Sequence, residues 1–296
     1  MKPILVPTDF SKCSYNAAHF AIALAKETKA KIILLHVYQF PNPPAVTHIT
    51  PIAQLDMQDE RLKRVYEMAE FELTLHGKEE LVIESEVIAG FTVEGIITAS
   101  QKHDAGIIVM GTQGADGLKK IFMGSNTSNV ISKSSCPVLA VPENAKYLGF
   151  NKVVFAADFH EIKSNISFEP LVEIALLFNS ETLIFSVRKN ESDIPSIIQA
   201  FERLNLDKVF ERIPHSFHTA VSEDTAGEID KFVNTNHIDL LVTMPQKHSY
   251  LELIFNKSIT HDLVFHATVP ILCLPEKKLT IEKQNREYEK ADKGLN

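Results

Sequence analysis

An internal repeat constrains the fold of this chain more than any other feature of its sequence. Residues 121–127 read IFMGSNT, and residues 254–260, which lie 133 positions further on, read IFNKSIT. At the same separation, residues 137–143 read PVLAVPE and residues 270–276 read PILCLPE. A chain of 296 residues that carries two copies of one unit is expected to fold into two domains of one architecture.

The beginning of each copy is marked by a second match. Residues 6–10 read VPTDF, and residues 156–159 read AADF at a separation of 149 positions. The separation falls from 149 to 133 along the copies, so the second copy is shorter by 16 residues, and the Pro-rich stretch Pro41–Pro51 is the expected place of the difference. We therefore predict one domain over 1–146, a second over 147–276, and a charged tail over 277–296.

Short apolar runs alternate with amphipathic stretches in both copies, which is typical of parallel strands joined by helices. In the first copy the expected strands cover residues 2–7, 31–37, 81–88, 106–110 and 137–141. In the second copy they cover residues 152–157, 182–187, 209–217, 238–242 and 269–274. The prediction is an α/β chain with two tandem, open, doubly wound domains, each with a five-stranded parallel sheet whose ligands bind beyond the carboxyl ends of the strands.

Composition excludes several classes of protein. Hydrophobic residues make up 45% of the chain and charged residues 23%, which indicates a globular protein and excludes disordered and collagen-like chains. A net charge of −8 disfavours binding to a nucleic-acid backbone. The three cysteines form no C-x-x-C pair, the N-terminus lacks the apolar segment of a secretory signal, and no apolar run approaches the roughly 18–20 residues of a membrane span. We expect a soluble cytoplasmic protein.

Glycines follow the fourth expected strand at a spacing that favours phosphate binding. Gly111 and Gly114 come directly after the strand, and Gly124 and Ser125 follow nine intervening residues, just before an amphipathic helix. Glycines let backbone N–H groups approach a phosphate closely, and a helix N-terminus attracts an anion. For any single one of these glycines a turn is the better explanation, and it is the set of three glycines with Ser125 after a buried strand that favours phosphate binding. Neither G-x4-G-K-[ST] nor G-x-G-x-x-G is present, which excludes the P-loop and common dinucleotide-binding classes.

The pattern G-x2-G-x9-G-S resembles the ATP-binding branch of the universal stress protein family, and the repeat resembles the tandem form of that family over about residues 1–276. This resemblance implies the adenine-nucleotide alpha-hydrolase-like fold and binding of ATP or AMP, with or without Mg²⁺. It implies adenine contacts after the first strand and at the end of the second, a ribose contact at Gly111, and phosphate contacts around the later glycines. The implied nucleotide-binding residues are Pro7, Thr8, Asp9, Val37, Met110, Gly111, Gly114, Gly124, Ser125 and Asn126.

The residues alone leave the role of Asp9 open. A carboxylate at a strand end can accept a hydrogen bond from an adenine amino group or a ribose hydroxyl. The same side chain could cap the first helix, a role that Ser11 could take instead. Val37 and Met110 are expected to be core residues on pattern alone.

The second copy departs from the glycine pattern. Gly111, Gly114 and Gly124 correspond to Met244, Lys247 and Lys257, whereas Ser125 corresponds to Ser258 and Asp9 to Asp158. Bulky side chains replace the positions of close approach. We therefore expect that the second copy does not bind ATP as the first does, and that Lys247 or Lys257 either occupies its pocket or serves another anionic ligand.

Three functions compete at this point. The leading one is a regulatory or stress-survival factor that binds ATP or AMP and acts on an unidentified client protein. The alternatives are a slow ATPase or phosphoryl-transfer enzyme that uses Ser125 or Asp9, and a scaffold that needs no nucleotide. Beyond Asp9 and the lysines of the glycine loop, phosphoryl transfer lacks an obvious residue set, so no catalytic residues are assigned and turnover is expected to be slow or absent.

Metal and thiol chemistry are not expected. His215 and His218 would point to opposite faces of a strand, and no H-E-x-x-H motif occurs. Cys136 and Cys273 are expected to be buried, and Cys13 to be the exposed thiol. The family resemblance further implies that residues 137–141 pair with residues 270–274, so that one chain imitates a family dimer, and a further homodimer stays open.

Overall fold

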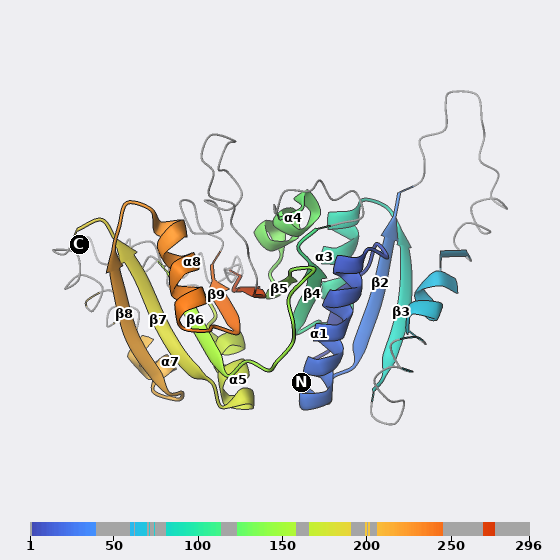
Figure 1. The fold of residues 1–296 in the computed structure, drawn as a ribbon. Helices are drawn as coiled ribbons and strands as arrows, with labels where there is room; N and C mark the ends of the chain where they lie inside the picture. Colours follow the sequence, from blue (N-terminus) through green and yellow to red (C-terminus); the bar gives the residue numbers. More distant parts are fainter. Residues whose placement is uncertain are drawn as a thin grey trace, which may run out of the picture.

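A computed structural model of the chain, shown in Figure 1, describes residues 2–39, 60–61, 63–69, 71, 74, 81–113, 123–157, 166–190, 199, 201, 206–244 and 269–275. The strands β1 to β10 that these residues form all belong to one sheet. Gly114, the Pro-rich stretch Pro41–Pro51 and the tail over 277–296 lie outside the described residues. So do the second-copy positions Asp158, Lys247, Lys257 and Ser258.

The first half of the sheet has the order β3-β2-β1-β4-β5, with every neighbouring pair parallel. Its strands are β1 (Ile4–Pro7), β2 (Ile32–Tyr38), β3 (Ile83–Ala89), β4 (Ile107–Gly111) and β5 (Val138–Val141). Its helices are α1 (Lys12–Thr28), α3 (Thr92–Lys102) and α4 (Ser125–Lys133), and residues 60–61 and 63–69 are also helical. The chain winds outward from β1 to β3 and then returns to β4, which is the doubly wound arrangement.

The second half repeats this order as β8-β7-β6-β9-β10. Its strands are β6 (Lys152–Ala156), β7 (Glu181–Arg188), β8 (His215–Val221), β9 (Leu240–Thr243) and β10 (Ile271–Cys273). Its helices are α5 (Glu169–Phe178), α7 (Leu206–Phe210) and α8 (Thr225–Thr235). The predicted α/β fold class, two five-stranded units of doubly wound topology, is confirmed.

The two halves meet through their last strands. β5 and β10 pair antiparallel, with Leu139 opposite Leu272, and they lie at the centre of the molecule in Figure 1. This pairing extends two five-stranded sheets into one of ten strands and confirms the predicted contact between residues 137–141 and 270–274.

Both faces of the sheet are buried, which explains why the strands are rich in Val, Ile and Leu. One apolar layer contains α1, α5 and α7, and α1 contributes Ala17, Ala21 and Leu24 to it. The opposite layer contains α3, α4 and α8. Within the described part of the chain, no helix has the length and apolar character needed to span a membrane.

The strand predicted over residues 209–217 was placed too early. Helix α7 continues to Phe210, and β8 begins only at His215. The fully buried Phe210 packs against Phe155 and Phe168, so this apolar segment faces the core from a helix. Short apolar runs do not distinguish a buried helix turn from a strand, which is the reason for the error.

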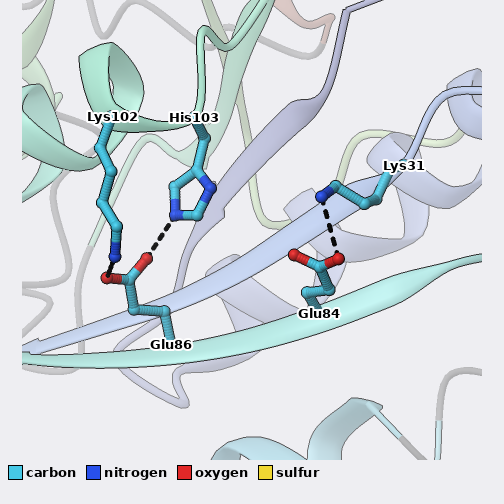
Figure 2. A network of polar contacts seen from close by, with 5 residues as sticks. All are labelled: Lys31, Glu84, Glu86, Lys102 and His103. Carbon is cyan, nitrogen blue, oxygen red and sulfur yellow. Dashed lines mark hydrogen bonds and ion pairs between the residues drawn. The ribbon is translucent and has the colours of Figure 1, made fainter.

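The edge strand β3 carries charged side chains, drawn in Figure 2. Glu84 accepts a hydrogen bond from Lys31 at 2.9 Å, and Glu86 is paired with both Lys102 and His103 near the end of α3. Burial alone would raise the pKa of Glu86, but the hydrogen bonds from Lys102 and His103 outweigh it, and the pKa is lowered. Charges on an edge strand oppose unwanted pairing with a further strand.

Candidate functional site

The carboxyl ends of β1, β2 and β4 meet at one edge of the sheet, where the winding of the chain reverses. β1 lies between β2 and β4 and is parallel to both, so all three strands end on the same side. The Thr8 amide donates to the Leu35 carbonyl at 2.7 Å, and the Thr112 amide donates to the Val141 carbonyl at 3.0 Å. The loops that leave β1 and β4 are thus fixed to neighbouring strands at a switch point, where ligands of such sheets bind.

The loop after β1 is held by its own side chains. Thr8 is buried, and its Oγ1 accepts a hydrogen bond from the Phe10 amide at 3.0 Å. Asp9 is exposed, and its Oδ1 accepts from the Ser11 amide at 3.0 Å. Ser11 caps α1, since its Oγ accepts from the Ser14 amide at 3.2 Å. The cap of α1 is therefore Ser11, which leaves Asp9 at the exposed edge of the site.

Met110 lies in the core, as its pattern predicts, and Val37 is partly buried and packs against that core. Val37 packs against α3 so closely that a Cβ added to Gly95 would lie 2.8 Å from its Cγ1. Met110 is 6% exposed and belongs to the apolar layer beneath α3 and α4.

Gly111 is required for helix packing, a reason that the glycine pattern did not reveal. A Cβ at Gly111 would lie 2.8 Å from the sulfur of Cys13 on α1. The expectation that Cys13 is exposed is wrong, because this side chain points from the first turn of α1 onto β4. Its thiol donates to the Val141 carbonyl at 3.3 Å, and burial raises its pKa. Cys136 and Cys273 are buried as predicted.

Helix α4 begins at Ser125, as predicted, and its N-terminus has no side-chain cap. Gly124 occupies the cap position with φ −59°, and its amide donates to the Thr112 carbonyl at 2.5 Å. The Thr127 hydroxyl donates to the Gly111 carbonyl at 2.7 Å, so the first turn is tied to the end of β4. Ser125 and Asn126 are exposed in this turn. An uncapped first turn presents N–H groups and the positive end of the helix dipole to an anion.

A buried histidine next to this loop was missed. His36 on β2 is 7% exposed, and its Nδ1 lies 2.7 Å from the Thr8 carbonyl oxygen. Its Nε2 lies 3.1 Å from a guanidinium nitrogen of Arg61. A carbonyl only accepts and a guanidinium only donates, so the ring is neutral with its hydrogen on Nδ1. Burial lowers its pKa first of all, and Arg61 and Arg64 add to this. The sequence feature that could have identified His36 is a histidine within the otherwise apolar run LLHVY of residues 34–38.

At one position, the carboxyl edge of the second half carries a side chain where the first half has a glycine. Met244 replaces Gly111, and its side chain is 2% exposed within the apolar layer. His215 contacts the rings of Phe210 and Phe217, whereas His218 contacts Phe232 of α8, which confirms that the two histidines point to opposite faces. Among the described residues, no three His, Cys, Asp or Glu side chains are grouped so that they could hold a metal ion.

Comparisons with known proteins relate the first half of the chain to one family. The sequence model of the universal stress protein family matches residues 1–142. Universal stress protein MJ0531 of Methanocaldococcus jannaschii is 35% identical over 150 residues, which cover 49% of this chain and 84% of that protein. Universal stress protein MJ0577 of the same organism is 30% identical, over 47% of this chain and 94% of that protein.

One solved structure extends the similarity to both halves. The crystal structure of a universal stress protein from Archaeoglobus fulgidus aligns with 92% of this chain and 97% of its own, with a TM-score of 0.66 and 18% identity. At that identity, the comparison establishes the shared fold.

Proposed function

Because the chain belongs to the universal stress protein family, we propose that its first half binds ATP or AMP at the carboxyl edge of β1, β2 and β4. The protein would act in the cytoplasm as a regulatory factor of stress survival, whose effect on a client protein depends on the bound nucleotide. The three cysteines are buried and unpaired, which fits a reducing compartment. The binding unit would be residues 1–146, and residues 147–276 would form the second unit.

The uncapped N-terminus of α4 carries this proposal. It follows Gly124 directly, is tied through Thr127 to the end of β4, and exposes Ser125 and Asn126. Phosphate oxygens would accept hydrogen bonds from its first amides, in a field that favours negative charge. The exposed Asp9 on the adjacent β1 loop would accept from the adenine amino group or a ribose hydroxyl. With Pro7, Thr8, Val37, Met110 and Gly111, these are the described residues that would hold the nucleotide, and Gly114 would complete the set.

Magnesium fits this arrangement as a companion of the phosphates. The described residues offer no group of three His, Cys, Asp or Glu side chains that could hold an ion without them. We propose that Mg²⁺, where present, enters with ATP.

The second half would not bind nucleotide in the same way. Met244 places a buried side chain where the first half has Gly111. We propose that this half serves the architecture of the chain, through the β5–β10 contact.

Calorimetric titration of nucleotide-free protein with ATP and with AMP, with and without Mg²⁺, tests the proposal. We expect one site per chain. In Gly124→Asp, the new side chain would cap α4 and place a carboxylate where phosphate binds, so affinity should fall at least about tenfold while thermal stability is kept or raised. Gly124→Asn caps the helix without the charge and serves as the matched control, with a smaller loss. The backbone at Gly124 has φ −59°, which any residue can adopt.

Each other result has a definite meaning. Two sites per chain would show that the second half also binds. No binding to either nucleotide would contradict the proposal and favour a scaffold that needs no nucleotide. Gly114→Lys should abolish binding as well, because a long side chain replaces a glycine of the phosphate loop. Phosphate release measured in the same samples separates a binder from a slow ATPase.

A further inference from the structure

The two halves share a hydrogen bond that crosses from the second strand to the residue after the first strand. In the first half the His36 ring donates to the Thr8 carbonyl at 2.7 Å, and in the second half the Ser186 hydroxyl donates to the Ala157 carbonyl at 3.1 Å. The strand registers make these positions equivalent. Val6 pairs with Leu34, and Phe155 pairs with Ile184; in each half the bonded residues lie two positions further on. This contact holds the carbonyl at the start of the loop in both halves.

The first half adds a second link that a serine cannot make. The Nε2 atom of His36 accepts a hydrogen bond from Arg61, which lies among the helical residues 60–61 and 63–69, referred to below as the helical segment 60–69. The Arg61 guanidinium also lies 4.7 Å from the centre of the Tyr38 ring. The imidazole therefore connects that helical segment with the carbonyl group that precedes Asp9.

Phe10 provides a parallel connection between the same two parts of the chain. Its ring lies 4.8 Å from the His36 ring, and the Arg64 guanidinium lies 4.2 Å from the centre of the Phe10 ring. Phe10 has φ 63°, a left-handed conformation that is unfavourable for a bulky side chain. Surrounding contacts must hold it there, and they include those with His36, Thr8 and Arg64 as well as packing against the apolar layer of α1. Arg64 thus contacts the loop 8–11 directly at Phe10, whereas Arg61 reaches it through His36.

We propose that His36 is a positioning residue for nucleotide binding. It holds the Thr8 carbonyl, and with it the loop that carries Asp9, in a place that the helical segment 60–69 sets through Arg61. This inference rests on the proposed function of the same site. It implies that nucleotide affinity and the position of the segment 60–69 depend on one another, because coupling between two sites is reciprocal.

The first test compares two variants of His36 by calorimetric titration with ATP. His36→Leu removes both hydrogen bonds, and affinity should fall about tenfold. His36→Asn keeps a neutral N–H donor near the place of Nδ1, and affinity should stay within about threefold of the wild type. Ser186→Ala removes the equivalent bond in the second half and should leave affinity unchanged. Equal affinity in all variants, or an equal loss in His36→Leu and His36→Asn, would overturn the proposal.

The link to the helical segment is tested separately. Arg61→Met keeps the length of the side chain but removes its donors and charge, so affinity should fall about threefold. Lys63→Met, an exposed change on the same segment, is the control and should have no effect. An unchanged affinity in Arg61→Met would show that the segment does not act through His36.

A measurement without nucleotide separates the failure of this proposal from failure of the proposed function. The amides of Phe10 and Ser11 donate to Thr8 Oγ1 and Asp9 Oδ1, so their hydrogen exchange reports whether the loop is held. Exchange should be faster in His36→Leu and near the wild-type rate in His36→Asn. If the wild type binds no nucleotide but exchange follows this pattern, the proposed function fails and His36 still positions the loop. Unchanged exchange in His36→Leu overturns the positioning role, whatever the binding result.

Discussion

The carboxyl edges of the two halves differ although the sheets beneath them are alike. In the first half, four residues, 8–11, lie between β1 and α1, whereas in the second half β6 ends at Ala156 and α5 begins at Glu169, and residues 158–165 between them lie outside the described part of the chain. Gly111 ends β4 against α1 with no side chain, while Met244 at the matching position is buried. The strand order and the register of the first two strands are nevertheless repeated.

This difference shows that different residues determine the packing of the sheet and the conformation of its carboxyl edge. The strands are held by backbone hydrogen bonds and by apolar side chains on both faces, which tolerate exchange among hydrophobic residues of suitable volume. The edge depends on a few positions where a backbone must come close or a loop must take one conformation. One half can therefore lose the edge features of the other without losing the fold.

The largest expected effect tests the aromatic core of the second half. Phe155 is fully buried and packs against Phe168 and Phe210, with ring centres 5.5 and 6.0 Å away. Phe155→Ala should lower the free energy of unfolding by about 3–5 kcal/mol. Val6→Ala, at the equivalent place in the first half, should cost roughly half as much because fewer buried carbon atoms are removed. Urea denaturation measures the loss of unfolding free energy in both variants. Equal losses would contradict the expectation that the aromatic side chain contributes more stability at this position than the valine does.

The close approach at Gly111 gives the next effect. Gly111→Ala places a Cβ against the sulfur of Cys13, so the free energy of unfolding should fall by about 1–3 kcal/mol. Adding Cys13→Ala to the Gly111→Ala variant should restore part of the lost stability. A double-mutant cycle would reveal this as coupling between the two positions. Strict additivity would contradict the contact, and with it the packing reason for this difference between the halves.

The pH dependence of stability distinguishes His36 from Ser186. Burial lowers the pKa of His36 from 6.5, the Thr8 carbonyl and Asp9 oppose this, and Arg61 and Arg64 add to it. The unfolded chain then binds more protons, so the stabilisation is present in full above about pH 6.5 and is lost as the pH falls through the lowered folded pKa. In His36→Asn, stability should fall less from pH 7 to pH 5 than in the wild type. Parallel curves of thermal midpoint against pH would contradict this.

The smallest effect concerns the charged edge strand in Figure 2. Lys31 and Glu84 form a pair whose side chains are 35% and 52% exposed, so solvent screens their attraction. Lys31→Met should change the free energy of unfolding by less than about 1 kcal/mol, and the difference should shrink further in high salt. A larger loss in urea denaturation would contradict the expectation that solvent screens this pair.

Several parts of the fold could be predicted because they depend on local patterns. The start of α4 at Ser125 and the buried strands follow from residue types within a few positions of one another. The cap of α1 was narrowed to Asp9 or Ser11, and the structure decides for Ser11. The β5–β10 pairing was implied by family resemblance. The segment around Val209 and Phe210 was assigned wrongly because an apolar run fits both a strand and a buried helix turn.

Other parts depend on contacts between residues far apart in the chain. The burial of Cys13 depends on Gly111 and Val141, and the role of His36 depends on Thr8 and Arg61. No local pattern specifies which of these groups will meet, because the packing of helices against the sheet decides it.

The sequence by itself determined that this protein has two copies of an α/β unit and that only the first keeps the glycine pattern. These are properties of order and spacing along the chain. The tertiary structure alone decided that Gly111 makes room for Cys13 and that a neutral His36 links Arg61 to the loop of Asp9. The reason is physical: close packing and hydrogen bonding join groups by distance in space, and that distance exists only once the sheet and its helices have assembled.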